Sequence, residues 1–250
     1  MRPDLLFGFF SSAAGVAAFA RACNVGWLAD WEMPGYAVSR AAACVDVGVK
    51  KLIVGVQYML FQGSTYYGTT LAQANLRGMF DALRQAGTLG YVVAIYPVDE
   101  PDRLGVSEQL LTQVCKDIRQ VLAGYSELAG CKLAVIYGSQ GRVTPALASF
   151  DWAGFDDYDS GAAIFTNGMY EAFAAKLLPA QRAILVPGGA SPWKQDPAPF
   201  LAVAESDARV GLIAPFIWIN YGSPTTTPGI GSNGMAAAYL AAGAQVVGST

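Results

Sequence analysis

The acidic side chains that could do chemistry gather in two short stretches of the chain. Tyr-Pro-Val-Asp99-Glu100-Pro-Asp follows one apolar run, and Phe-Asp156-Asp157-Tyr-Asp follows another. Hydrolysis of a glycosidic bond needs a protonated carboxylic acid beside the leaving oxygen and a second carboxylate that attacks or activates water. Because a neighbouring like charge raises the pKa of a carboxyl group, Asp99 would help to keep Glu100 protonated. The spacing therefore predicts acid–base chemistry with Glu100 as the general acid.

Aromatic and amide side chains follow several of the apolar runs. Sugars present apolar ring faces and polar hydroxyl edges, so aromatic platforms beside hydrogen-bonding groups suit them. The alternative interpretation is that these rings simply occupy the half-wet rim of the fold. The candidate sugar-binding residues are Trp31, Tyr58, Tyr96, Tyr158, Trp193, Trp218 and Asn220.

The composition excludes several classes of function. The chain has no histidine, which rules out a Ser-His-Asp triad, a Cys-His pair and a histidine-ligated zinc. Its four cysteines form no Cys-x-x-Cys pair and are expected to be free thiols. A net charge of −3 gives no electrostatic footprint for nucleic acid. We expect neither a metal ion nor an organic cofactor, and no apolar run is long enough for a transmembrane helix.

Eight short apolar runs alternate with helical patterns along the 250 residues. The runs are nearly continuous rather than alternating, which is typical of parallel strands covered on both faces. This pattern predicts one domain, residues 1–250, folded as an α/β (β/α)8 TIM barrel, with its site at the carboxyl ends of the strands. An open doubly wound sheet is the alternative, but no Gly-x-Gly-x-x-Gly follows any run. The predicted strands are 5–11, 25–30, 51–58, 91–98, 132–138, 152–158, 183–187 and 211–219, and the predicted helices are 13–23, 35–47, 69–85, 107–128, 169–178, 198–208 and 235–242.

The first apolar run has some features of a secretory signal peptide. Asp4 spoils a positively charged start, however, and Gly8 and the pair Ser11-Ser12 interrupt the apolar stretch. Removing this segment would also remove the first of the eight predicted strands. We therefore expect residues 4–22 to be part of the fold, and the chain to be cytoplasmic or released without a leader.

The motif Asp99-Glu100-Pro101, placed after the fourth predicted strand, resembles that of the (β/α)8 glycoside hydrolases of the clan A type. Those enzymes carry Asn-Glu-Pro or Asp-Glu-Pro at this place, with the Glu as general acid/base. The resemblance implies that Glu100 is the proton donor and Asp99 its partner. The clan places a nucleophilic Glu after strand seven, whereas residues 185–191 of this chain contain no carboxylate.

The second carboxylate therefore stays open between three sources. Asp156 or Asp157 could supply it, but successive strand residues point to opposite faces, so both cannot face the site while the strand continues. Asp30 or Glu32 could also supply it. In the third route an N-acetyl group of the substrate attacks, and the Asp99-Glu100 pair suffices.

The sequence predicts a glycoside hydrolase acting on an oligo- or polysaccharide. The main alternative is a barrel that binds carbohydrate without cleaving it. A remote alternative is a phosphosugar lyase or isomerase, with a phosphate bound by Gly188 and Gly189 after strand seven. The oligomeric state does not follow from the sequence.

Overall fold

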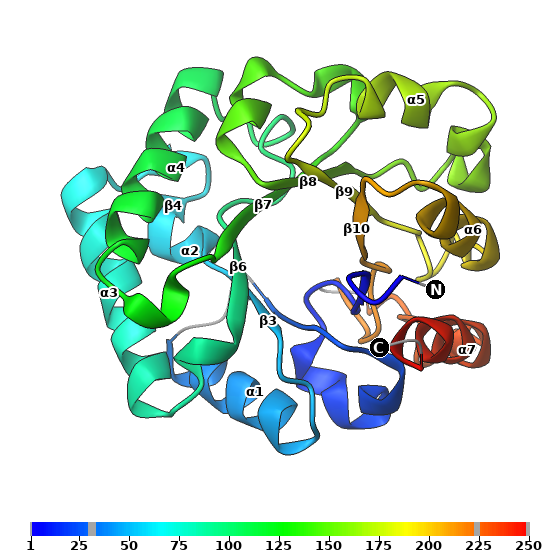
Figure 1. The fold of residues 1–250 in the computed structure, drawn as a ribbon, viewed down its shortest axis with the longest axis horizontal. Coiled ribbons are helices and arrows are strands. Elements are labelled where there is room, and N and C mark those ends of the chain that lie inside the picture. Colours follow the sequence, from blue (N-terminus) through cyan, green and yellow to red (C-terminus); the bar gives the residue numbers. More distant parts are fainter. Residues whose placement is uncertain (1, 30–33, 223–225, 249–250) are drawn as a thin grey trace.

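The computed structural model describes residues 2–29, 34–222 and 226–248, which form a ring of parallel strands surrounded by helices (Figure 1). The eight-stranded sheet has the order β1-β10-β9-β8-β7-β6-β3-β2, with all paired neighbours parallel. The predicted (β/α)8 fold is confirmed, although each strand is shorter than its apolar run. The strands are β1 (Leu6–Phe7), β2 (Gly26–Leu28), β3 (Leu52–Gly55), β6 (Val92–Tyr96), β7 (Lys132–Tyr137), β8 (Trp152–Phe155), β9 (Arg182–Leu185) and β10 (Val210–Ile213).

The side chain of Asn24 joins β1 to the start of β2. The backbone N–H of Phe7 donates to Asn24 Oδ1 at 2.8 Å, and Asn24 Nδ2 donates to the carbonyl of Leu5 at 3.0 Å. The backbone N–H of Asn24 donates to the carbonyl of Phe7 at 3.1 Å. An amide side chain offers both a donor and an acceptor, as a peptide group does, so Asn24 takes the place of strand-to-strand hydrogen bonds where the ring closes.

Helices cover the outer face of the ring, and those predicted over 35–47, 69–85 and 198–208 are confirmed to within two residues at each end. The helices predicted over 107–128 and 169–178 end earlier, at Leu122 and Ala174, and the one predicted over 235–242 extends to Val247. Residues 13–23 form two short 3-10 helices, Ala13–Ala18 and Ala20–Ala22, rather than one α-helix. Gly15 there packs against Trp218 and Ile219, where a larger side chain would have little room. No helix among the described residues has the length and apolar character needed to cross a membrane. The α-helices of six residues or more are α1 (Pro34–Asp46), α3 (Thr69–Gln85), α4 (Glu108–Leu122), α5 (Met169–Ala174), α6 (Ala198–Ser206) and α7 (Ala236–Val247).

Apolar side chains form two cores, one inside the ring and one between the ring and the helices. Successive strand residues point to opposite faces, so a parallel strand contributes to both cores and reads as a continuous apolar run. The predicted free thiols are confirmed: Cys23, Cys44 and Cys115 are buried and Cys131 is half-buried, all without disulfides. The inner core contains Leu6, Phe10, Val25, Trp27, Ile53, Ala94, Tyr96, Ala134, Ile136, Ile184, Val186, Leu212 and Ala214.

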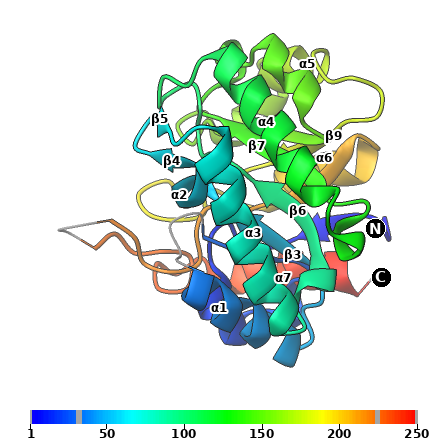
Figure 2. The same ribbon diagram turned by 90° about the vertical axis from the view of Figure 1, so that its left-hand side faces the viewer.

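A buried carboxylate on α4 fixes the segment that follows β3. This segment contains the short helix α2 (Gln57–Leu60) and the hairpin of β4 (Phe61–Gln62) and β5 (Thr65–Tyr66). Asp117 accepts hydrogen bonds from Tyr66 Oη at 2.6 Å and Thr69 Oγ1 at 2.9 Å. Figure 2 shows α2 and the hairpin at the same end of the barrel as the loops that follow β9 and β10. Asp117 therefore holds one part of the rim on which the candidate site is built.

Candidate functional site

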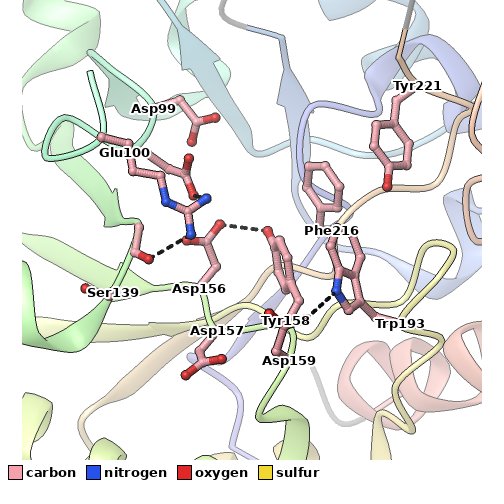
Figure 3. Close-up of a pocket in the computed structure, with 12 residues that line it drawn as sticks. Asp99, Glu100, Ser139, Asp156, Asp157, Tyr158, Asp159, Trp193, Phe216 and Tyr221 are labelled. Carbon is pink, nitrogen blue, oxygen red and sulfur yellow. Dashed lines mark hydrogen bonds and ion pairs between the residues drawn. The ribbon is translucent and has the colours of Figure 1, made fainter. Parts of the chain in front are cut away.

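A cleft of about 550 Å³ opens at the carboxyl ends of the strands (Figure 3). Its lining comes from the segments that follow β6, β7, β8, β9 and β10, so five parts of the chain that are distant in sequence meet there. Acidic side chains form one side of the cleft, and aromatic rings form the other. The lining residues are Asp99, Glu100, Arg103, Gly138, Ser139, Asp156, Asp157, Tyr158, Asp159, Trp193, Phe216 and Tyr221.

Glu100 and Asp156 lie close together on the acidic side, near enough for the charge of Glu100 to act on Asp156. Asp156 is only 7% exposed. Burial first, and the charge of Glu100 second, raise the pKa of Asp156 to about 8. Asp156 therefore stays protonated at neutral pH.

The turn that carries Glu100 is tied to the end of β7. Arg103 Nη1 lies 2.6 Å from Glu100 Oε1, and Arg103 Nη2 donates to the carbonyl of Gly138 at 3.0 Å. Asp102 Oδ1 accepts from the backbone N–H of Gly138 at 2.8 Å. Glu100 itself has a φ of 40°, in the left-handed region that few residues other than glycine adopt. These ties hold its backbone in that uncommon conformation.

Asp99 lies beside this pair and is held by two elements. Its Oδ1 accepts from Tyr96 Oη at 2.6 Å, and its backbone N–H donates to Gln57 Oε1 at 2.9 Å. Tyr96 is fully buried in the inner core. The prediction that Tyr96 binds a sugar ring is therefore wrong, because the ring presents no open face. Its hydroxyl group orients a carboxylate of the cleft instead.

Asp156 and Asp157 point in different directions, as the alternation of strand residues predicts. Asp157 accepts from the backbone N–H of Ser160 at 3.0 Å and from its hydroxyl at 2.9 Å. Figure 3 shows the Asp157 carboxylate directed away from Glu100. Of the two candidates on this strand, Asp156 is the one that meets Glu100, and Asp157 stabilises the turn that follows.

Four aromatic side chains form the opposite wall. Tyr158 stacks on Phe216 with ring centroids 5.3 Å apart and packs against Trp193 at 4.6 Å. Tyr221 packs edge-on against Phe216 at 5.1 Å. Tyr158 Oη also donates to Asp156 Oδ2 at 2.7 Å, so the wall and the carboxyl pair share a hydrogen bond. The placement of Tyr158 and Trp193 fits the sequence interpretation.

The remaining predicted binding residues lie elsewhere. Trp218 is 9% exposed and packs between Phe9 and Phe19, so it is a core residue, and the prediction that it binds sugar is wrong. Asn220 Oδ1 accepts from the backbone N–H of Gly229 and from Ser232 Oγ, which ties the long loop together. Tyr58 is 56% exposed on α2 and does not line the cleft. Trp31, together with Asp30 and Glu32, lies outside the described residues.

Four cleft residues escaped the sequence analysis: Arg103, Gly138, Ser139 and Phe216. Arg103 could have been suspected, because it follows Glu100 by three residues within one turn. Phe216 could not be assigned from the sequence, because the sequence does not show where the alternation of the last strand ends. Leu212 and Ala214 face the inner core and Phe216 packs against it, whereas Trp218 belongs to the outer core.

The segment after β9 offers no phosphate cradle. The backbone N–H groups of Gly188, Gly189, Ala190 and Ser191 donate to Gln195 Oε1 and to the carbonyls of Pro187, Phe216 and Pro228 respectively. These donors are already used within the protein, which argues against the phosphosugar alternative. Gly188 has a different role, because a Cβ there would lie 2.9 Å from the Tyr158 ring. Within the described ranges, no group of three or more Cys, Asp or Glu side chains is arranged to hold a metal ion.

Comparisons with known proteins agree with the fold. No family model and no curated protein sequence matches the chain. Among solved structures, a glycoside hydrolase family 17 β-1,3-glucanosyltransferase from Rhizomucor miehei aligns with a TM-score of 0.62 at 11% identity, over 90% of this chain and 92% of that one. The catalytic domain of a mannanase from Streptomyces sp. SirexAA-E aligns with a TM-score of 0.54 at 16% identity, over 89% and 77%.

A GH113 β-1,4-mannanase aligns over 98% of both chains, with a TM-score of 0.55 at 8% identity. At such low identities the likeness concerns the fold alone. The chain thus has the (β/α)8 fold that these carbohydrate-active enzymes share.

Proposed function

We propose that this protein is a glycoside hydrolase acting on a β-linked oligo- or polysaccharide. The observation that carries the proposal is that Asp156, which lies beside Glu100, keeps its proton at neutral pH opposite an aromatic wall in one cleft. A general acid for glycosidic cleavage must be protonated at the working pH. The β linkages named for two of the structural neighbours, a β-1,3-glucanosyltransferase and a β-1,4-mannanase, suggest the type of linkage.

Within the pair, Glu100 is the member that would deliver the proton to the leaving oxygen. Its side chain is 21% exposed and lines the cleft, whereas Asp156 is almost completely buried. Asp156 then acts as the partner that supplies this proton to Glu100 and later recovers it. The rings of Tyr158 and Trp193 would pack against the apolar face of a sugar.

The second carboxylate of the reaction is Asp99 in this proposal, either as a base toward water or as support for an attacking N-acetyl group. Asp156 does not fit that role, because it is almost completely buried and keeps its proton at neutral pH. Asp99 lines the same cleft, and Tyr96 Oη orients its carboxylate.

The test uses Glu100→Gln with Glu205→Gln as a matched control, since Glu205 is exposed on α6. Both variants and the unmodified protein are incubated with β-1,3-glucan, β-1,4-mannan and N-acetylglucosamine oligosaccharides, and new reducing ends are counted. Loss of one general acid typically costs about 10²- to 10⁴-fold in rate. We expect that loss in Glu100→Gln, with glycan binding retained, and no loss in Glu205→Gln.

One observation favours a second candidate, a barrel that binds carbohydrate without cleaving it. The segment after β9 carries Pro187, Gly188 and Gly189 and no carboxylate. Binding of a glycan to the unmodified protein with no release of product would favour this candidate and refute the hydrolase. Equal turnover by Glu100→Gln would refute the assignment of Glu100.

A further inference from the structure

Arg103 is the one cationic side chain among the residues that line the cleft in the described parts of the chain. It contacts Glu100 at 2.6 Å, and its other Nη is fixed on the carbonyl of Gly138. Gly138 packs directly under the guanidinium stem, at a distance that a Cβ would not allow. Gly138, at the end of β7, therefore holds the Arg103 side chain beside the carboxyl groups of Glu100 and Asp156.

The charges that surround the pair come from two segments. The segment after β6 contributes Asp99 and Arg103, and the segment after β8 contributes the hydroxyl of Tyr158. Asp99 raises the pKa of Asp156 and the Tyr158 hydrogen bond lowers it. The lining residues from the segment after β7 are Gly138 and Ser139, which are uncharged. Arg103 is thus the positive charge that opposes the carboxylates at this place.

We infer that Arg103 is a positioning residue that holds Glu100 in the cleft and sets the acidity of the Glu100–Asp156 pair. A cation beside the two carboxyl groups stabilises the ionised form of Asp156, so Asp156 loses its proton at a lower pH than it would without Arg103. Removal of the cation should therefore move the loss of that proton to higher pH. This inference rests on the proposed function for its importance in catalysis, but the proton equilibrium can be measured without turnover.

The experiment is a pH titration of the side-chain carboxyl carbons by ¹³C NMR, with Asp156 and Glu100 assigned through Asp156→Asn and Glu100→Gln. Arg103→Gln removes the charge, and Arg103→Lys keeps the charge but loses the planar guanidinium. Arg142→Gln is the matched control, because Arg142 is an exposed arginine that follows the same strand, β7, and does not line the cleft.

An arginine in contact lowers a carboxyl pKa by about 1–3 units, and the half-exposed position of Arg103 places it at the lower limit. We expect Arg103→Gln to lower the acid dissociation constant of the pair about tenfold. Arg103→Lys should stay within about threefold of the unmodified protein, and Arg142→Gln should leave the titration unchanged. The high-pH limb of the pH–rate profile for glycan cleavage should shift to higher pH by the amount that corresponds to this change in the acid dissociation constant.

Three results would overturn the inference: an unchanged titration in Arg103→Gln, an equal shift in Arg142→Gln, or equal shifts in Arg103→Gln and Arg103→Lys. The last would mean that packing rather than charge controls the pair. If no glycan is cleaved but the titration shifts as expected, the role of Arg103 stands and the hydrolase proposal fails. If glycan is cleaved and the titration does not shift, the hydrolase proposal stands and the role of Arg103 is refuted.

Discussion

Replacement of Asp156 by asparagine should stabilise the protein at neutral pH while removing its activity. The pKa of Asp156 rises from an ordinary value of 3.8 to about 8, because the carboxyl group is buried beside Glu100. Below pH 3.8 the group is protonated in both the folded and the unfolded chain and costs nothing. As the pH rises above 3.8, only the unfolded chain releases the proton, so the free energy of unfolding falls until the pH passes about 8.

The size of this loss follows from the two pKa values. Each unit of pH between the unfolded and folded pKa costs about 1.4 kcal/mol. At pH 7 the cost is about 4 kcal/mol. An amide in place of the carboxyl group resembles protonated Asp156, since it can accept from Tyr158 without ionising. The variant should therefore lack this part of the pH dependence.

The assay is urea denaturation of the unmodified protein, Asp156→Asn and Asp157→Asn at several pH values between 4 and 9. The difference between Asp156→Asn and the unmodified protein should grow by about 4 kcal/mol from pH 4 to pH 7. Asp157→Asn is the matched control, because its carboxylate binds Ser160 and points away from Glu100. Parallel curves for Asp156→Asn and the unmodified protein would refute the raised pKa of Asp156. The proposed reaction would then lack its source of a proton.

Two further changes test the cleft itself. Tyr158→Phe removes the hydroxyl that lowers the pKa of Asp156, so the high-pH limb of the pH–rate profile should move to higher pH; an unmoved limb would contradict that role. Trp193→Ala should weaken glycan binding about tenfold or more with little change in thermal stability, whereas Trp218→Ala should cost about 3–5 kcal/mol of stability because Trp218 lies in the core. The opposite pattern in the two tryptophan variants, measured by calorimetry, would mean that the assignment of wall and core is reversed.

The sequence by itself predicted the eight parallel strands of the barrel and the end of those strands at which the candidate cleft lies. A run such as 91–98 is continuous and apolar because each parallel strand packs on both faces, and this can be seen without a structure. Helix starts are equally local: Ser107 accepts from the backbone N–H of Leu110 and caps α4, as its position before Glu108 predicts. The Asp-Glu-Pro motif after the fourth strand could be placed at the mouth of the barrel for the same reason.

Only the tertiary structure decided which side chains meet in the cleft. Asp156 and Asp157 are equivalent in sequence, but just after the end of β8 one lies beside Glu100 and the other accepts hydrogen bonds from Ser160. The alternation of the last strand continues to Phe216, which packs against the inner core. It has ended at Trp218, which lies in the outer core. The hydrogen bond from Arg103 to the carbonyl of Gly138 joins residues 35 apart in the chain. Such contacts depend on how neighbouring strands and loops lie in space, which composition and periodicity do not encode.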